Sequence, residues 1–388
     1  MLSTLPIFSM TVLKLPQKFI KLLDRVRRRF IWGVEENETA GGKCKISWSK
    51  VCSPTEHGGL GILDLNRFAR ALRLRWQWMQ WQQPRRPWAG METPCDTQDL
   101  DLFAAATTVT LGDGSTASFW YSNWIGSSPL RLRFPELFTA SRRKGRTVAA
   151  ALDGNRWVLD LSHIAATPLI RSFVTLWREI QRAEIHLQEG TRDTICWSLT
   201  DSQCYTARSA YRMQFEGRIR SPIRELVWTV WAPAKCKLFS WLLLQNRLWC
   251  ADRLLRRGWP NPYFCALCSR NLETASHLFL ECPVSNSIWT SVSSWPGCAG
   301  LLPTTWAGCT GIAEAWQAAI EATAPQGRHA IKSLLILTCW IIWKERNGRI
   351  FNQRRSSVPQ LVQTIRDEAR EWAFMGAKKL RKLLWEPP

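Results

Sequence analysis

Adjacent aspartates are missing from this chain, and its 31 acidic residues are outnumbered by 52 lysines and arginines. Catalysis by two metal ions needs at least two carboxylates that converge on those ions. The missing pair therefore argues against polymerase, nuclease or integrase activity. Histidine is also scarce, and four of the five residues stand alone, without the neighbouring nucleophile and base of a catalytic site. We do not expect an enzyme.

Long apolar runs are absent too. The longest, residues 333–343, is too short to cross a bilayer and is typical of a buried core helix. The N-terminal region lacks the small-residue cleavage site of a secretory leader and carries Lys14, Lys18 and Lys21. Without secretion, the 13 cysteines should stay reduced. These features predict a nuclear or cytoplasmic protein that is neither secreted nor transmembrane and has no membrane partner.

Positive charge is the main compositional excess. The formal net charge is +21, and apolar residues make up 46% of a 388-residue chain that is long enough for two or three domains. A surplus of this size favours a polyanionic partner, with nucleic acid ahead of a membrane surface. The alternatives are a basic protein that is merely soluble and one that assembles with an acidic protein.

Four residues have the spacing of a metal site. Cys265, Cys268, His277 and Cys282 form the pattern Cys-x2-Cys-x8-His-x4-Cys within 18 residues. Two cysteines three positions apart can hold one ion from a tight turn, and the histidine and last cysteine can complete a tetrahedron. Three thiolates and one imidazole favour Zn²⁺, and a site with every position filled by protein is structural. The alternative is two buried cysteines beside an unrelated histidine.

Hydrophobic periodicity predicts a mostly helical α+β fold with short β-hairpins and a small Cys-Cys-His-Cys zinc knuckle. The clearest hairpin is expected where 108–111 and 115–120 flank the turn at 112–114, and short strands are expected at 157–161 and 195–205. The apolar helix 236–248 should be buried close to the knuckle. The other predicted helices span 17–31, 66–81, 169–185, 206–231, 251–257, 311–323 and 329–350, and a basic amphipathic segment runs from 358 to 385.

Composition divides the chain into four segments. A Pro-rich break at 84–97 follows a basic helical segment, 1–83. Residues 84–200 form a Trp-rich α+β linker region with the hairpin, 201–295 contain the knuckle, and 296–388 form a basic helical tail. We expect these segments to be the domains of the chain.

The sequence around the knuckle carries several further motifs. Between Trp231 and Trp289 these are W-A-P-A-K-C-K-L-F-S-W-L-L-L-Q-N-R-L, D-R-L-L-R-R-G, C-A-L-C, E-T-A-S-H-L-F-L-E-C-P and I-W, with Y-T-A-R-S-A-Y upstream. The series resembles the zinc-binding domain of plant LINE-type retrotransposon reverse transcriptases. In that family the positions of the four candidate ligands carry the metal. Cys250 departs from the family, which more often has a small hydroxyl residue there, and this leaves the ligand set unchanged.

Other motifs extend the resemblance over nearly the whole chain. Five motifs resemble the segment that follows the polymerase palm in that family: L-P-I-F-S-M, R-R-R-F-I-W-G, W-S-K-V-C-S-P, G-G-L-G and A-L-R-L-R-W. Two more resemble pieces of the family that flank the zinc-binding domain: G-D-G-S-T-A-S-F-W-Y-S-N-W and W-K-E-R-N-G-R-I-F. The parent polyprotein would be an RNA-directed DNA polymerase, whose paired palm carboxylates this chain lacks. The resemblance implies a C-terminal fragment that begins after the palm and ends before any ribonuclease H domain. Its candidate partner is the polymerase part of the parent element.

Two functions remain open. In the first, basic helix faces grip RNA or DNA with low sequence specificity, and an exposed Trp249 or Trp259 stacks on a base of a single strand. In the second, a zinc-stabilised scaffold contacts only proteins, and its charges serve solubility. The predicted nucleic-acid contacts are Arg25, Arg28, Arg29, Arg253, Arg256, Arg257, Lys378, Lys379, Arg381 and Lys382.

Overall fold

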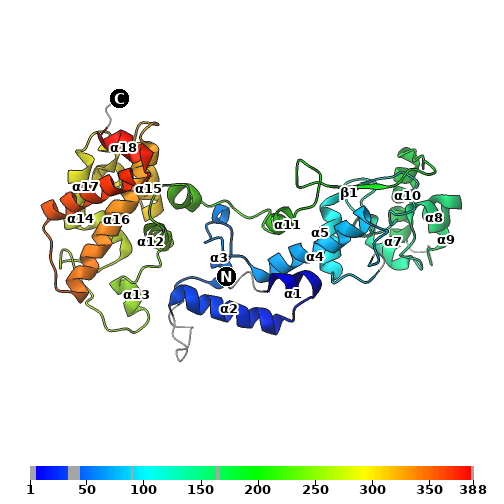
Figure 1. Cartoon of the computed structure of the whole chain (residues 1–388), viewed down its shortest axis with the longest axis horizontal. Coiled ribbons are helices and arrows are strands. Elements are labelled where there is room, and N and C mark those ends of the chain that lie inside the picture. Colours follow the sequence, from blue (N-terminus) through cyan, green and yellow to red (C-terminus); the bar gives the residue numbers. More distant parts are fainter. Residues whose placement is uncertain (1–5, 34–43, 89–90, 163–166, 386–388) are drawn as a thin grey trace. The chain divides into compact units, whose positions relative to one another are not determined.

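The computed structural model describes residues 6–33, 44–88, 91–162 and 167–385, which form two compact units (Figure 1). One unit comprises Met1–Glu38 and Leu63–Gly217, and the other comprises Thr39–Ile62 and Arg218–Pro388. Helices dominate both units, and the strands of the described residues form one two-stranded sheet. The mostly helical α+β class is thereby confirmed. The four segments inferred from composition stay a prediction.

The first unit contains a long helix, α4 (Leu65–Gln82), on which neighbouring helices pack. It begins where the carboxylate of its N-cap residue, Asp64, accepts hydrogen bonds from two backbone N–H groups of the first turn. Arg73 of α4 donates to the fully buried carboxylate of Asp99 at 2.7 and 2.9 Å, which fixes the following helix against it. The neighbouring helices are α1 (Ile7–Val12), α2 (Gln17–Trp32), α5 (Thr97–Ala105) and α11 (Ala207–Met213).

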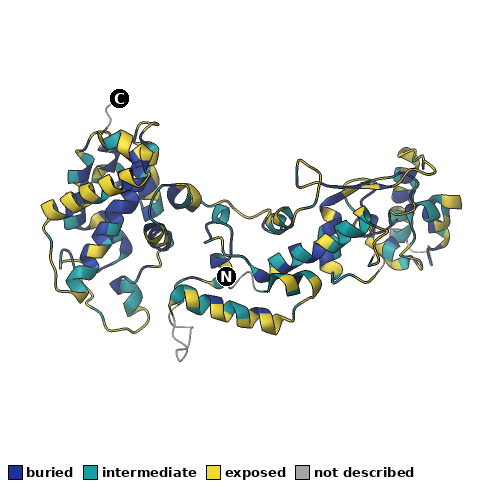
Figure 2. Cartoon of the chain, viewed as in Figure 1, coloured by how far each residue is buried: buried dark blue, intermediate teal, exposed yellow. Residues whose placement is uncertain are grey.

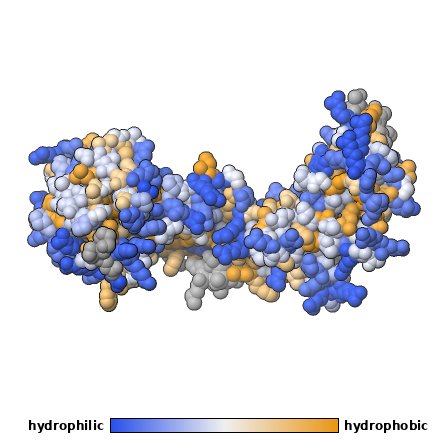
Figure 3. Space-filling view, turned by 90° about the horizontal axis from the view of Figure 1, so that it is seen from above, coloured by the Kyte–Doolittle hydropathy of each residue, from blue (hydrophilic) through white to orange (hydrophobic). Residues whose placement is uncertain are grey.

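Helix α2 exposes apolar side chains. Phe19, Leu22, Val26 and Phe30 recur at helical spacing and are between 44% and 80% exposed. The buried side of the helix carries Arg27, which is 4% exposed and forms hydrogen bonds within the unit. Much of α2 is therefore exposed in Figure 2. Apolar residues are also interspersed with hydrophilic ones over the face of the molecule drawn in Figure 3. We call Phe19, Leu22, Val26 and Phe30 the α2 stripe.

The sheet pairs residues that are distant in sequence. Strand β1 (Thr107–Thr110) runs antiparallel to β2 (Thr194–Trp197), with Val109 opposite Ile195. The strand expected within 195–205 is thus confirmed in its first part. The hairpin expected around 112–114 is wrong, because residues 115–120 form bends, turns and one isolated bridge, from Ser118 to Thr147, and do not pair with β1.

A buried carboxylate explains the missing hairpin. Asp193 precedes β2, and its Oδ1 accepts the N–H groups of Gly112 and Gly114 at 2.8 and 2.9 Å. Its Oδ2 accepts those of Thr116 and Ala117 at 2.9 and 2.8 Å. Buried backbone donors need partners, and here Asp193 supplies the acceptors that a second strand would otherwise provide. The chain therefore curls around one side chain.

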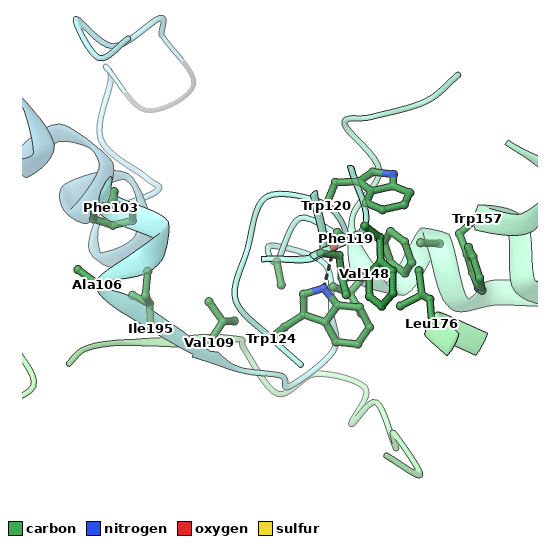
Figure 4. Packing of buried hydrophobic residues seen from close by; sticks show 14 of the residues in the cluster. Phe103, Ala106, Val109, Phe119, Trp120, Trp124, Val148, Trp157, Leu176 and Ile195 are labelled. Carbon is green, nitrogen blue, oxygen red and sulfur yellow. Dashed lines mark hydrogen bonds between the residues drawn. The ribbon is translucent and has the colours of Figure 1, made fainter. Parts of the chain in front are cut away.

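Aromatic packing fills the core of the first unit. The rings of Phe119 and Trp157 lie 5.7 Å apart at 27°, and the indole N–H of Trp124 donates to the carbonyl of Phe119 at 2.9 Å (Figure 4). Residues 157–161 are not the predicted strand: burial of Trp157 in this cluster outweighs local β-propensity, and the segment forms α9 (Arg156–Leu159). The other helices of the cluster region are α6 (Leu130–Arg133), α7 (Pro135–Ala140), α8 (Val148–Leu152), η2 (Asp153–Asn155) and α10 (Thr167–Arg182).

The second unit surrounds α16 (Arg328–Phe351), which packs against α12, α15, α17, α18 and η3. Its residues 333–339 are all buried, so the predicted core helix at 333–343 is confirmed. Among the described residues, no helix combines the length and apolarity of a membrane span. The other helices of this unit are α3 (Trp48–Val51), η1 (Thr55–His57), η3 (Arg224–Trp228), α12 (Ala234–Leu244), α13 (Ala251–Leu255), η4 (His277–Glu281), α14 (Pro283–Ser293), η5 (Ala299–Leu301), η6 (Pro303–Trp306), α15 (Ile312–Glu321), α17 (Val358–Phe374) and α18 (Lys378–Trp385).

Helix α12 is buried close to the candidate metal ligands, as predicted for the apolar run 236–248. Six of its residues are buried, and the ring of Phe239 lies 6.1 Å from that of Phe279 in η4. The helix ends at Leu244, earlier than the predicted 248, and Asn246 then adopts a φ of 51°. The helix predicted at 206–231 is also discontinuous, since α11 and the π-helical turn η3 replace it.

A glycine turn attaches residues 44–62 to the rest of the second unit. A Cβ on Gly59 would lie 1.8 Å from the carbonyl oxygen of Ser53, so only glycine fits there. The carbonyl of Gly58 accepts a 3.0 Å hydrogen bond from the indole of Trp241, a residue of α12 that is fully buried. The turn therefore has a packing role.

We expect Asp193→Ala to lower the free energy of unfolding of the first unit by about 3 kcal/mol or more, since each buried N–H left unpaired costs about 1–3 kcal/mol. The matched control is Asp113→Ala, which removes a carboxylate of the same turn that accepts the exposed N–H of Ser115 at 2.9 Å. Urea unfolding followed by tryptophan fluorescence measures both variants. Equal losses for the two would contradict the central role of Asp193.

Candidate metal centre

A short antiparallel bridge holds the turn that carries the first two candidate ligands. Phe264 pairs with Leu272, and the N–H of Cys265 donates across the bridge at 2.8 Å. Ser269 adopts a φ of 56° and donates its N–H to the carbonyl of Cys265 at 2.8 Å. The chain therefore reverses tightly between Cys265 and the end of the bridge, with Cys268 inside the reversal. We call residues 265–268 the cysteine turn.

Of the other two candidate ligands, His277 is the first residue of the π-helical turn η4, and Cys282 directly follows that turn. The N–H of Cys282 donates to the carbonyl of His277, five residues earlier, at 2.7 Å, which defines the wide turn. Two carbonyl groups of the turn accept instead from α14, at 2.6 Å from the hydroxyl of Ser285 and at 2.8 Å from the indole of Trp289. The turn is therefore fully braced by the helix that follows it.

These two segments bring the four candidate ligands together. One ligand atom from each of Cys265, Cys268, His277 and Cys282 lies within 4.8 Å of all the others. The sulfurs of Cys265 and Cys282 are 3.9 Å apart, and the sulfur of Cys268 is 3.4 Å from Nε2 of His277. A tetrahedral ion with metal–sulfur bonds of about 2.3 Å and metal–nitrogen bonds of about 2.0 Å has edges of roughly 3.5–3.8 Å. The donor set and its spacing thus fit a metal ion.

Charge and burial at the cluster also suit a cation. Cys265, His277 and Cys282 are buried and Cys268 is half-buried. The hydrogen bond from Cys265, helped by N–H groups at the start of α14, lowers the pKa of the Cys282 thiol. The same hydrogen bond and burial raise the pKa of the Cys265 thiol, so one of the two thiols is the readier to become a thiolate. Nδ1 of His277 lies 3.9 Å from a carboxylate oxygen of Glu281. A carboxylate there favours a proton on Nδ1 and leaves Nε2 to face the cysteines.

A buried ion pair connects the cluster to two helices. Glu273 is 1% exposed and Arg346 of α16 is 3% exposed. The guanidinium donates to both carboxylate oxygens at 2.6–3.1 Å, and the N–H of Ala251 at the start of α13 donates to the same carboxylate at 3.1 Å. Neither charged residue is predicted from the pattern of ligands. The available signal is an arginine directly after an apolar helical run, where charge is rarely buried unless paired.

Arg253 on α13 and Arg256, which directly follows that helix, are two predicted nucleic-acid contacts that differ in how far their side chains are exposed. The side chain of Arg256 is 71% exposed and lies 3.5 Å from the carboxylate of Asp252. Arg253 instead donates to the carbonyl of Asn246 at 2.6 Å, and burial, followed by the charge of Arg247, lowers its pKa. Arg256 is therefore the freer cation of the two.

The third, Arg257, belongs to an aromatic surface. Its guanidinium carbon lies 4.9 Å from the ring centre of Trp249 and 6.0 Å from that of Trp259. The two indole rings are 5.2 Å apart, and Trp259 is 40% exposed. Tyr263 and Phe264, which lead into the cysteine turn, are 52% and 56% exposed. Basic and aromatic side chains thus occur together along the segment before the cluster.

The remaining predicted contacts lie on two other helices. On α2, in the first unit, Arg25 is exposed while Arg28 and Arg29 are half-buried. On α18, in the second unit, Leu380 is buried and the predicted cations all point outward. Those exposed cations are Lys378, Lys379, Arg381 and Lys382.

Comparison with known proteins agrees with this geometry. Residues 205–289, which include all four candidate ligands, match the family model described as zinc-binding in reverse transcriptase. The chain is also 26% identical over 326 residues to a putative ribonuclease H protein of Arabidopsis thaliana. Both similarities support a retrotransposon-related protein. The alignment covers 75% of this chain and 50% of that relative, so the chain spans about half the length of the curated protein it matches.

Proposed function

We propose that the chain is a zinc-binding and nucleic-acid-binding C-terminal part of a LINE-type retrotransposon reverse transcriptase, without the polymerase catalytic domain. The carrying observation is the convergence of three sulfurs and one imidazole nitrogen within 4.8 Å. The match of 205–289 to a reverse-transcriptase zinc-binding family supports zinc as the ion. With all four positions filled by protein, Zn²⁺ would stabilise the fold and leave no open position for catalysis.

Nucleic-acid binding is proposed from the surface beside the cluster. Arg256 and Arg257 follow α13, whose start is bonded to Glu273 within the metal-binding segment. A braced basic turn can meet phosphates without losing much conformational freedom. The exposed ring of Trp259 offers a stacking surface for an unpaired base. These features favour single strands and contacts with little sequence preference.

A protein-interaction scaffold is the second candidate function. The α2 stripe favours it, since exposed apolar patches often mark protein contacts. The expected partner is the polymerase part of the parent element. Salt separates the two functions, because phosphate contacts release counterions and weaken steeply with ionic strength, whereas an apolar contact does not.

We expect one zinc ion per purified chain, measured by elemental analysis. Cys268→Ser and Cys282→Ser should each lose the ion, and a strong chelator should increase hydrogen exchange across 264–293, because structural zinc contributes folding free energy directly. Cys204→Ser, at an exposed cysteine outside the cluster, is the matched control and should keep its zinc. A zinc-free parent chain that is nevertheless fully protected at 264–293 would refute the site.

We expect salt-sensitive binding of single-stranded RNA or DNA. Changing Arg253, Arg256 and Arg257 together to Ala should lower the slope of log affinity against log salt by about 1.4 or more, since each phosphate contact on a single strand contributes about 0.7 and Arg253 already donates to the carbonyl of Asn246. Gel-shift titrations at several salt concentrations give the slope.

The control for that titration is a triple change of exposed arginines in the first unit, Arg142, Arg143 and Arg171, which removes the same charge. An equal effect of both triple variants would indicate general charge attraction. An unchanged slope in the variant without Arg253, Arg256 and Arg257 would exclude nucleic-acid binding by the surface beside the cluster. Binding by the parent chain that is insensitive to salt would favour the protein-interaction scaffold.

We propose no catalytic role for this chain alone, because the paired carboxylates of a polymerase palm are absent from its sequence. The purified chain with Mg²⁺ should neither extend a primed template nor cleave an RNA–DNA hybrid. A commercial reverse transcriptase with ribonuclease H activity, added to the same buffer, shows that the assay works. Turnover that copurifies with the parent chain and disappears when an acidic residue is changed would overturn the proposal.

A further inference from the structure

Arg349, near the end of α16, contacts the backbone of the cysteine turn. Its Nη1 donates to the carbonyl of Leu267 at 2.9 Å and to that of Ala266 at 3.3 Å. These are the two residues between Cys265 and Cys268. One guanidinium thus bonds the peptide groups that set the separation of the first two candidate ligands.

The guanidinium is itself held in place. Its Nε donates to Oε1 of Glu345 at 2.7 Å, and that oxygen also accepts the N–H of Ser356 at 2.9 Å. The side chains of Arg349 and Glu345 are 14% and 5% exposed. Arg349 therefore approaches the turn from a fixed, mostly buried position, and Glu345 sets its orientation.

The two arginines of α16 act on opposite ends of the site segment. Arg349 bonds the cysteine turn, and Arg346 bonds Glu273, which lies between that turn and His277. Both arginines lie outside the matched segment 205–289. The support of the ligands thus comes from a helix that begins about 40 residues after that segment ends, at Arg328.

We propose that Arg349, oriented by Glu345, is a positioning residue for the metal site, which keeps the cysteine turn in its ligating geometry and slows release of the ion. The inference rests on the proposed zinc site. Outer residues that orient metal ligands typically contribute about 10–100-fold to metal affinity. Without the guanidinium, the carbonyls of Ala266 and Leu267 lose a rigid donor, and the turn must be ordered again each time the ion binds.

The test is the rate at which the full-length, zinc-loaded chain releases Zn²⁺ to a colorimetric chelator. Arg349→Met keeps an unbranched, flexible side chain, shorter than that of arginine and without its donors, and should release zinc about 10-fold faster. Arg349→Lys, which restores one donor, should fall between that variant and the parent. Glu345→Gln leaves Arg349 in place with weaker orientation and should also accelerate release, so it tests the inference even if Arg349→Met does not fold.

Two controls separate positioning from general stability. Arg355→Gln removes an exposed arginine from the non-helical segment that follows α16 and should leave the rate unchanged. Ile365→Ala truncates a fully buried residue of α17, so it should lower the unfolding temperature without accelerating release to the same extent. The absorption of Co²⁺-substituted chains reports whether the ligand geometry changes in each variant.

The outcomes distinguish failure of the positioning role of Arg349 from failure of the proposed zinc site. A parent chain that takes up no zinc refutes the proposed metal site. A parent chain that binds zinc, with release from Arg349→Met and Glu345→Gln within about twofold of its rate, refutes the positioning role alone, because an outer residue of this kind should contribute about 10-fold or more.

Discussion

The buried ion pair between Glu273 and Arg346 is the contact on which the second unit depends. It joins the metal-binding segment and the start of α13 to α16, whose Arg346 lies 73 positions after Glu273 in the sequence. Removing one partner of such a pair leaves a charge in the interior at a cost of about 3–5 kcal/mol. The pair therefore favours one arrangement, in which α16 lies against the metal-binding segment, because neither charge is paired in the interior without the other.

This constraint gives α16 two different halves. Residues 333–339 are all buried and form the core of the unit, which explains their continuous apolar sequence. Glu345, Arg346 and Arg349 follow immediately and direct charge toward the segment with the cysteine turn. Arg256 and Arg257 follow α13, and the start of that helix is held by the same pair, because the N–H of Ala251 donates to Glu273. Metal binding and nucleic-acid binding, as proposed, thus share one support.

Local pattern predicts much of this chain and fails where one side chain from far away decides the structure. The spacing of Cys265, Cys268, His277 and Cys282 is sufficient because a tight turn and a following helix bring such ligands together locally. Long apolar runs likewise predict α12 and α16. The hairpin fails because Asp193, some 80 residues later, captures the N–H groups that the second strand would use. Likewise Arg349 reaches a turn 82 residues earlier, and no spacing rule indicates such a contact.

The glycine turn at Gly58 and Gly59 has a consequence for how the chain becomes folded. Its hydrogen bond to Trp241 spans 183 positions, and the residues of the first unit from Leu63 to Gly217 lie between the two partners. During synthesis, the segment 44–62 leaves the ribosome long before α12 exists. The residues of this segment that are buried in the folded unit therefore remain in contact with water until the intervening residues and α12 have been synthesised. Closing a loop of that length lowers the conformational entropy of the chain before any stabilising contact forms. Folding of the second unit should therefore be completed late and slowly.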